Sequence, residues 1–146
     1  MVLEKRKERR IRVSLPITIL YQDKRKVLGK IENMSRLGTY AEINKEIRIG
    51  TDIEIILTIP VYTKDLSLSG KIRCKGKIFR CNLLREAESQ KYYGIGIFFT
   101  EFLEQDDKDK LSKYIDFLIL NEDRNIKKGL KQWRAKRGKV LGKGHV

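Results

Sequence analysis

The sequence predicts an all-β domain, a small antiparallel β-barrel of about six to seven strands with a C-terminal α-helix. Two observations support this prediction. Short β-branched and apolar stretches recur along most of the chain, and polar or glycine-containing turns separate them; this pattern is typical of a small barrel or sandwich. Near residue 106 the apolar period changes from two to three and four, which is the spacing of an amphipathic helix.

The first three expected strands precede residue 44. Residues 15–22 are β-branched and apolar, and Pro16 suits the first position of a strand. A polar turn separates them from residues 27–34, which are predicted to return as the second strand and lead directly into the sequence SRLG. Residues 39–43 alternate between apolar and polar side chains, as a half-buried strand does.

The next expected strands lie between residues 52 and 86. Residues 52–60 alternate at period two and stop at a proline. Residues 66–76 and 77–86 are predicted to form a hairpin that turns at the sequence KG. The candidate inward positions of this hairpin are Ile72, Cys74 and Ile78.

A last strand and a helix close the predicted barrel. Residues 92–102 form the strand, with Gly94 and Gly96 at positions where a side chain would be costly or obstructive. The helix is expected over residues 106–123, because two aspartates favour its first turn through the helix dipole. Its apolar stripe consists of Leu111, Tyr114, Ile115, Leu118 and Ile119.

The charge is unevenly distributed along the 146 residues. The chain has 33 basic and 19 acidic residues, a net charge of +14. We divide it into a basic N-terminal segment (residues 1–12), the barrel with its closing helix (13–121) and a basic tail (122–146). Because the cations concentrate at the two ends, an anionic partner is expected to meet the ends first.

The inventory of reactive side chains argues against an enzyme. The single histidine is His145, so neither a zinc site nor a nucleophile–histidine pair has its residues. Acidic pairs with catalytic spacing and a glycine-rich phosphate loop are also missing from the sequence. Cys74 and Cys81 could pair across a hairpin, but free thiols on buried strands are favoured. No apolar run has membrane-spanning length and no signal peptide is evident, so a cytoplasmic protein is expected.

The basic stretch RKERRIR, residues 6–12, places five cations in seven positions. Arg6 and Arg10 are four apart, so an irregular segment or a single turn can aim both guanidinium groups at one ligand. A guanidinium offers paired donors that match phosphate oxygens and the O6/N7 edge of guanine. A solvated segment without function is the alternative interpretation.

The sequence NMSRLG, residues 33–38, has a different chemistry. Asn33 carries both donors and an acceptor, Ser35 carries a hydroxyl, and Gly38 permits a close approach of the backbone. We expect Ser35 at an exposed turn. The alternative is purely structural, because Asn and Ser side chains also bond their own backbone in such turns.

Both motifs, in register with the predicted strands, resemble those of the PilZ domain, the bacterial receptor module for cyclic diguanylate (c-di-GMP). The family carries R-x-x-x-R before its first strand and D/N-x-S-x-x-G after its second, as RKERR and NMSRLG do here. The stretch YYGIGIFF is similar to the family's strand before the closing helix. The resemblance covers about residues 4–120 and implies a PilZ-type barrel that binds c-di-GMP without another cofactor.

The resemblance also implies a role for each matching residue. Arg6 and Arg10 would wrap the ligand, contacting phosphate and stacking on or hydrogen-bonding guanine. Asn33 and Ser35 would hold a guanine edge, and Gly38 matches the motif. Because Asn33 replaces the commoner Asp, its amide would accept a hydrogen bond without a carboxylate's charge, which implies weaker binding.

Three neighbouring cations extend this hypothesis. Arg9 and Arg36 are candidates for additional ligand contacts, with a solvated or phosphate-steering role as the alternative. Lys5 lies immediately before the first motif, where the family varies and where the residue affects the stoichiometry. One ligand molecule and an intercalated pair are both compatible with the sequence.

Two functions from different classes follow. In the first, c-di-GMP orders the arginine-rich N-terminal segment over the barrel and changes the surface offered to an unidentified downstream protein, which controls motility, exopolysaccharide or pili. In the second, a basic β-barrel binds nucleic acid or another anionic surface and recognises no dinucleotide. A monomer and a homodimer fit both functions.

The basic tail allows three interpretations. It is a solvated and partly disordered segment, a helix packed on its own barrel or on a partner subunit, or an arm for nucleic acid or an acidic membrane with Trp133 as anchor. A helical continuation would carry one apolar stripe, formed by Ile119, Ile126, Leu130 and Trp133.

Overall fold

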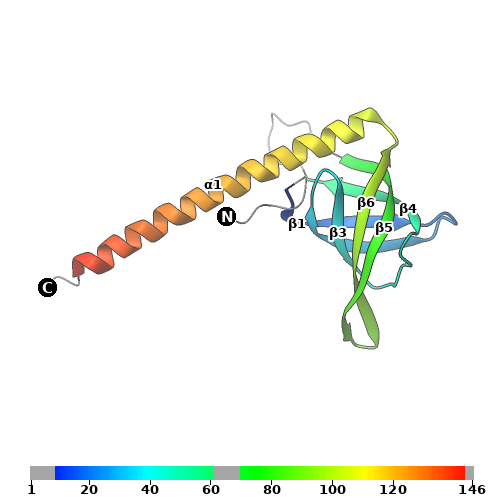
Figure 1. Cartoon of the computed structure of the whole chain (residues 1–146), viewed down its shortest axis with the longest axis horizontal. Helices are drawn as coiled ribbons and strands as arrows, with labels where there is room; N and C mark the ends of the chain where they lie inside the picture. The colour runs from blue at the N-terminus through cyan, green and yellow to red at the C-terminus, as the bar shows by residue number, and fades with distance from the viewer. Residues whose placement is uncertain (1–8, 61–69, 144–146) are drawn as a thin grey trace. The chain divides into compact units, whose positions relative to one another are not determined.

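Six antiparallel strands close into a barrel, and a helix follows them (Figure 1). The computed structural model describes residues 9–60 and 70–143, with side chains described as far as Arg124. Around the barrel the strands follow the order β1-β2-β3-β6-β5-β4. The elements are β1 (Ile11–Leu20), β2 (Lys26–Met34), β3 (Gly38–Ile43), β4 (Asp52–Ile59), β5 (Gly70–Ala87), β6 (Gln90–Phe102) and α1 (Gln105–Lys143). The predicted fold class is confirmed.

The barrel interior is filled mainly by isoleucine. Along each strand every second side chain faces inward, and β-branched residues pack well on such a pleated surface. The predicted inward positions Ile72, Cys74 and Ile78 are all buried, as expected. The fully buried residues from the other strands include Ile17, Ile19, Ile31, Ile55, Leu57, Ile95 and Ile97.

The predicted hairpin between residues 66–76 and 77–86 is wrong. From Gly70 to Ala87 the chain is one continuous strand, β5, and residues 66–69 lie outside the described ranges. Gly76 marks a register shift between β5 and β6 instead of a turn. A Cβ at Gly76 would lie 2.7 Å from Ile97 Cγ2, so glycine serves a close approach of two strands here.

The true hairpin joins β5 to β6 and extends past the barrel as a ribbon (Figure 1). Its tip holds Glu88 and Ser89, whose φ angles of 51° and 67° form the turn. The β3–β6 pairing ends at Ile43 and Tyr93, whereas the β5–β6 pairing continues to Ala87 and Gln90. Beyond the barrel the ribbon is therefore two-stranded.

The first part of α1 belongs to the compact unit Met1–Ile115, and a second unit comprises Asp116–Val146. Leu111, Tyr114 and Ile115, three residues of the predicted stripe, are buried. Asp107 is also buried, and its Oδ2 accepts a hydrogen bond from the backbone N–H of Arg73 at 3.1 Å. This contact fixes the start of α1 to β5.

The helix is longer than the expected residues 106–123, because its backbone continues to Lys143. Despite this length, none of its described residues form a stretch that is apolar enough to span a membrane.

Both cysteines are free thiols, as favoured by the sequence, and both lie on β5. Cys74 is buried in the barrel, whereas Cys81 is half-buried. Burial, with a smaller contribution from the negative charges of Asp107 and Glu54, raises the pKa of Cys74 to about 12. The Cys74 thiol is therefore protonated at neutral pH, and protonated thiols are poor nucleophiles.

We expect the two thiols to differ in reactivity. At pH 8 a thiol-specific disulfide reagent should modify Cys81 rapidly and Cys74 only as fast as the barrel opens, since the pKa of Cys74 is about 12. In denaturant both should react. Cys81→Ser should remove the fast phase, and two equally fast phases in the native protein would contradict the burial of Cys74.

Candidate functional site

The β2–β3 turn is a compact hydrogen-bonded structure. The Ser35 backbone N–H donates to the Gly38 carbonyl at 2.9 Å, and the Leu37 N–H donates to Ser35 Oγ at 3.1 Å. The Thr39 hydroxyl donates to the Asn33 carbonyl at 2.7 Å. Ser35 is only 7% exposed, so the expectation of an exposed serine is wrong. Its hydroxyl stabilises the turn from within.

Strand β6 holds this turn from the other side. The Phe99 N–H donates to the Leu37 carbonyl at 2.9 Å, and Gly38 pairs with Phe98. A Cβ at Gly38 would collide with the carbonyl oxygen of Ile97. The glycine of NMSRLG is therefore required for the close approach of β3 to β6.

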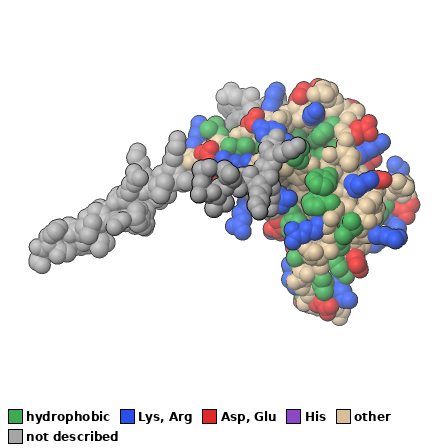
Figure 2. Space-filling view, viewed as in Figure 1, with side chains coloured by type: hydrophobic (Ala, Val, Ile, Leu, Met, Phe, Trp, Pro, Cys, Tyr) green, Lys and Arg blue, Asp and Glu red, His purple; other side chains and the backbone are tan. Residues whose placement is uncertain are grey.

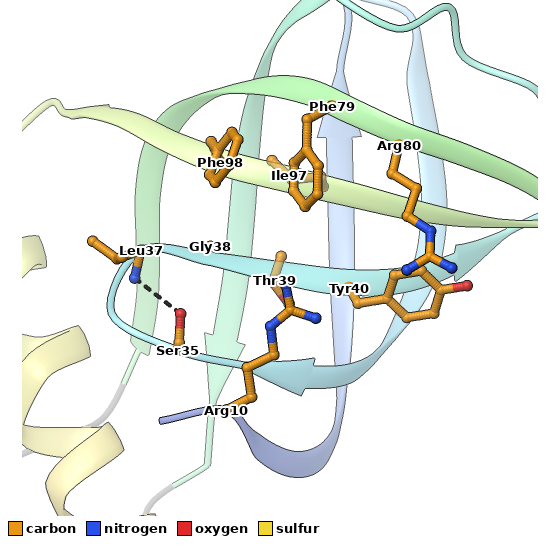
Figure 3. Close-up of a pocket in the computed structure, with 10 residues that line it drawn as sticks. All are labelled: Arg10, Ser35, Leu37, Gly38, Thr39, Tyr40, Phe79, Arg80, Ile97 and Phe98. Carbon is orange, nitrogen blue, oxygen red and sulfur yellow. Dashed lines mark hydrogen bonds between the residues drawn. The ribbon is translucent and has the colours of Figure 1, made fainter. Parts of the chain in front are cut away.

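A pocket of about 260 Å³ opens on the outer face of the barrel beside this turn (Figure 3). It brings together Arg10, from the chain just before β1, and Ser35 and Gly38 of the turn. Figure 2 shows hydrophobic side chains on this face of the barrel, with lysine and arginine side chains beside them. The complete lining consists of Arg10, Ser35, Leu37, Gly38, Thr39, Tyr40, Phe79, Arg80, Ile97 and Phe98.

Of the other predicted site residues that the structure describes, Asn33, Arg9 and Arg36 do not line the pocket. Arg6 and Lys5 lie outside the described residues. Asn33 is half-buried on β2, where it pairs with Arg12. Arg9 is also half-buried.

Arg36 has a contact that the sequence did not suggest. Its Nε donates to the hydroxyl of Ser112 on α1 at 3.2 Å. The turn is thus bonded to the closing helix.

The pocket residues that sequence analysis missed include three aromatic residues and an arginine on β3, β5 and β6, namely Tyr40, Phe79, Phe98 and Arg80. Phe79 and Phe98 are stacked, with ring centroids 4.2 Å apart and an interplanar angle of 26°. The guanidinium carbon of Arg80 lies 5.6 Å from the centroid of the Tyr40 ring, a cation–π arrangement. The sequence did contain one signal for this surface, because the outward positions of β6 are Gly94, Gly96 and Phe98. Which residues of β3 and β5 lie beside them depends on the register of the three strands, and the sequence does not give that register.

Two glycines of β6 provide the space for these rings. Gly96 pairs with Tyr40 on one side and with Arg80 on the other. A Cβ at Gly96 would lie 2.7 Å from Phe79 Cζ, and a Cβ at Gly94 would collide with the Tyr40 hydroxyl. The expectation that side chains at these two positions would be obstructive is confirmed.

The arrangement suits binding better than catalysis. Two guanidinium groups, from Arg10 and Arg80, flank a largely aromatic surface, which fits a ligand with both anionic and planar parts. Among the described residues, no cluster of His, Cys, Asp or Glu could hold a metal ion. The described lining residues offer no nucleophile–base pair either, since the ionisable side chains among them are the two arginines and Tyr40.

A sequence profile of the PilZ domain matches residues 4–117. The chain belongs to the PilZ domain family. Among curated proteins no match to the sequence was found.

Solved structures agree on the fold. The apo structure of K. pneumonia MrkH has a TM-score of 0.66 at 17% identity, covering 86% of this chain and 55% of MrkH. The Bacillus subtilis inhibitor of motility, MotI/DgrA, has a TM-score of 0.63 at 17% identity, with coverage of 82% and 53%. The PilZ domain of Escherichia coli YcgR, solved with c-di-GMP, has a TM-score of 0.62 at 9% identity, with coverage of 85% and 98%. This chain thus spans about half the length of MrkH and MotI.

The burial of Ser35 predicts a cost to stability. Ser35→Ala should lower the free energy of unfolding by about 1 kcal/mol, because the Leu37 N–H loses its acceptor. Urea denaturation without ligand measures this difference.

Ser14→Ala, at an exposed position on β1, is the matched control and should change stability by less than about 0.5 kcal/mol. Equal stabilities for both variants would show that the Ser35 hydroxyl does not stabilise the turn.

Proposed function

We propose that this protein is a c-di-GMP receptor without enzymatic activity, which changes conformation on binding and signals to a partner protein. The main support is the convergence of Arg10, Ser35 and Gly38 on one pocket, because they belong to both PilZ motifs. Two related structures are described with the dinucleotide, the MrkH–c-di-GMP complex and the YcgR PilZ domain.

Each pocket residue has a chemical role in this proposal. The Arg10 guanidinium binds a phosphate or the O6/N7 edge of a guanine through paired donors. Gly38 lets β3 approach β6 closely and so places the turn beside Phe98. The Ser35 hydroxyl already accepts the Leu37 N–H, and its own hydrogen remains to be donated to the ligand.

Arg6 and Asn33 complete the proposed site. Arg6 precedes Arg10 by four residues, and we propose that the ligand draws its guanidinium to the second phosphate or guanine. Asn33 lies immediately before the turn, from where its amide binds a guanine edge. Arg9 supplies a further positive charge next to Arg10.

Calorimetric titration with c-di-GMP tests the receptor function. The wild type should show saturable binding, and Arg10→Ala should weaken it at least about tenfold, because hydrogen bonds to charged groups contribute strongly. Arg12→Ala is the matched control: Arg12 is exposed on β1, and its removal should change the affinity by less than about threefold.

Absence of saturable binding by the wild type would contradict the receptor function. Tight binding to DNA or RNA that survives Arg10→Ala and falls steeply with salt would support the second function, a basic nucleic-acid-binding protein.

We propose that α1 transmits the ligand signal. Arg36 lies inside the turn that carries Ser35 and Gly38, and its Nε donates to Ser112 on α1. Leu111, Tyr114 and Ile115 anchor the same part of α1 in the core. A ligand that fixes the turn therefore also fixes the start of α1. We assign Arg36 to this link in preference to direct ligand contact.

Hydrogen exchange with and without c-di-GMP tests this link. In the wild type the ligand should slow amide exchange in residues 33–38 and also in residues 105–115. In Arg36→Ala the protection of residues 105–115 should be lost while that of the turn remains.

Arg48→Ala, which removes an exposed arginine between β3 and β4, should behave as the wild type. Unchanged exchange in residues 105–115 of the liganded wild type would contradict a role of α1 in signalling.

The basic C-terminal part of α1 favours a second interaction of the protein, with an anionic partner. From Arg124 onward the chain has nine lysines and arginines and no acidic residue, and the helix continues to Lys143. A helix of this charge attracts nucleic acid or an acidic membrane surface without sequence readout. We also propose that the ligand-bound protein acts on an unidentified downstream protein, which controls motility, exopolysaccharide or pili.

A further inference from the structure

The outer face of β3, β6 and β5 carries an unusual surface, which we call the aromatic shelf: Tyr40, Phe79 and Phe98 with Gly94 and Gly96 beneath them. Outward positions of a barrel are normally polar, because they meet water. Here the outward positions of β6 are Gly94, Gly96 and Phe98 in succession. The shelf belongs to neither PilZ motif, so motif chemistry does not account for it.

The shelf is packed from one side and partly open on the other. Phe79 rests on Gly96 and stacks on Phe98 at 4.2 Å, so the ring of Phe98 is supported on one side. Phe98 is nevertheless 50% exposed. When another flat apolar group covers such an exposed ring, apolar surface is removed from water and the two groups stack, so that binding is stabilised.

The residues around the shelf indicate which kind of flat group would bind to it. Arg10 and Arg80 line the same pocket, and Figure 3 shows the guanidinium of Arg80 lying over Tyr40. The pocket thus combines aromatic side chains with two guanidinium cations. A planar base joined to phosphate meets both features, as in sites for single-stranded nucleic acid.

We propose that the aromatic shelf is a stacking subsite, in which one purine base of the dinucleotide lies against Phe98 while Arg10 binds the adjoining phosphate. This inference rests on the proposed function and adds to it a base contact that the two motifs do not contain. Arg80, held over the Tyr40 ring, bounds the subsite at its far end and supplies a second positive charge.

The stacking subsite contacts the flat face of the base and not its hydrogen-bonding edge. Stacking is nearly independent of base identity, since every base has a π-face. The shelf therefore contributes affinity, whereas hydrogen bonds to the guanine edge from the turn select the base.

Substitutions at Phe98 test the shelf by calorimetry with c-di-GMP. Phe98→Ala should weaken binding by about 5- to 140-fold, the range that corresponds to loss of one base–aromatic stack. Phe98→Trp should retain wild-type affinity or exceed it, and Phe98→Leu should fall between, because leucine keeps an apolar surface without the aromatic face. Leu28→Ala is the matched control, since Leu28 is an exposed apolar residue on β2, outside the pocket.

Tryptophan fluorescence tests directly whether the base contacts position 98. Trp133 is the only tryptophan of the chain, so Phe98→Trp combined with Trp133→Phe places a single fluorophore on the shelf. Stacking on guanine should quench its emission as the ligand is added.

The outcomes separate the two proposals. Binding by the wild type with equal affinity for Phe98→Ala, or without quenching, overturns the stacking subsite and leaves the receptor function intact. Absence of binding by the wild type overturns both.

Discussion

The close approach of two backbones at Gly38 organises the whole site. At this point β3 comes so near to the carbonyl of Ile97 that no side chain fits between them. The same approach lets the Phe99 N–H bond to the Leu37 carbonyl and so ties the β2–β3 turn to β6. Because β6 also carries Phe98, this contact sets the hydrogen-bonding turn beside the aromatic rings. The position of each half of the pocket depends on it.

Local sequence patterns predicted the barrel well. Alternation identified the inward residues Ile72, Cys74 and Ile78 correctly, since a strand has only two faces and one of them must exclude water. The error at Gly76 has a physical cause. Glycine permits both a turn and a tight contact between strands, and the local sequence does not distinguish them.

The candidate site was only partly predictable for a different reason. Asn33, Ser35 and Gly38 lie within six residues and form a motif, so the sequence itself groups them. Tyr40 and Arg80 meet because both pair with Gly96, which requires the strand order β3-β6-β5 and its register. Such proximity arises from closure of the barrel and leaves no local trace. The bond from Arg36 to Ser112, 76 residues apart, is equally non-local.

The β5–β6 ribbon leaves the barrel after Tyr93 and ends in the tight turn at Glu88 and Ser89. Its tip contributes nothing to the buried interior, and its backbone pairs only with itself. Short peptide insertions are best tolerated at exposed tips of this kind. A dye or affinity handle grafted between Glu88 and Ser89 would therefore allow the intact protein to be immobilised or followed in cells, because neither residue lines the pocket.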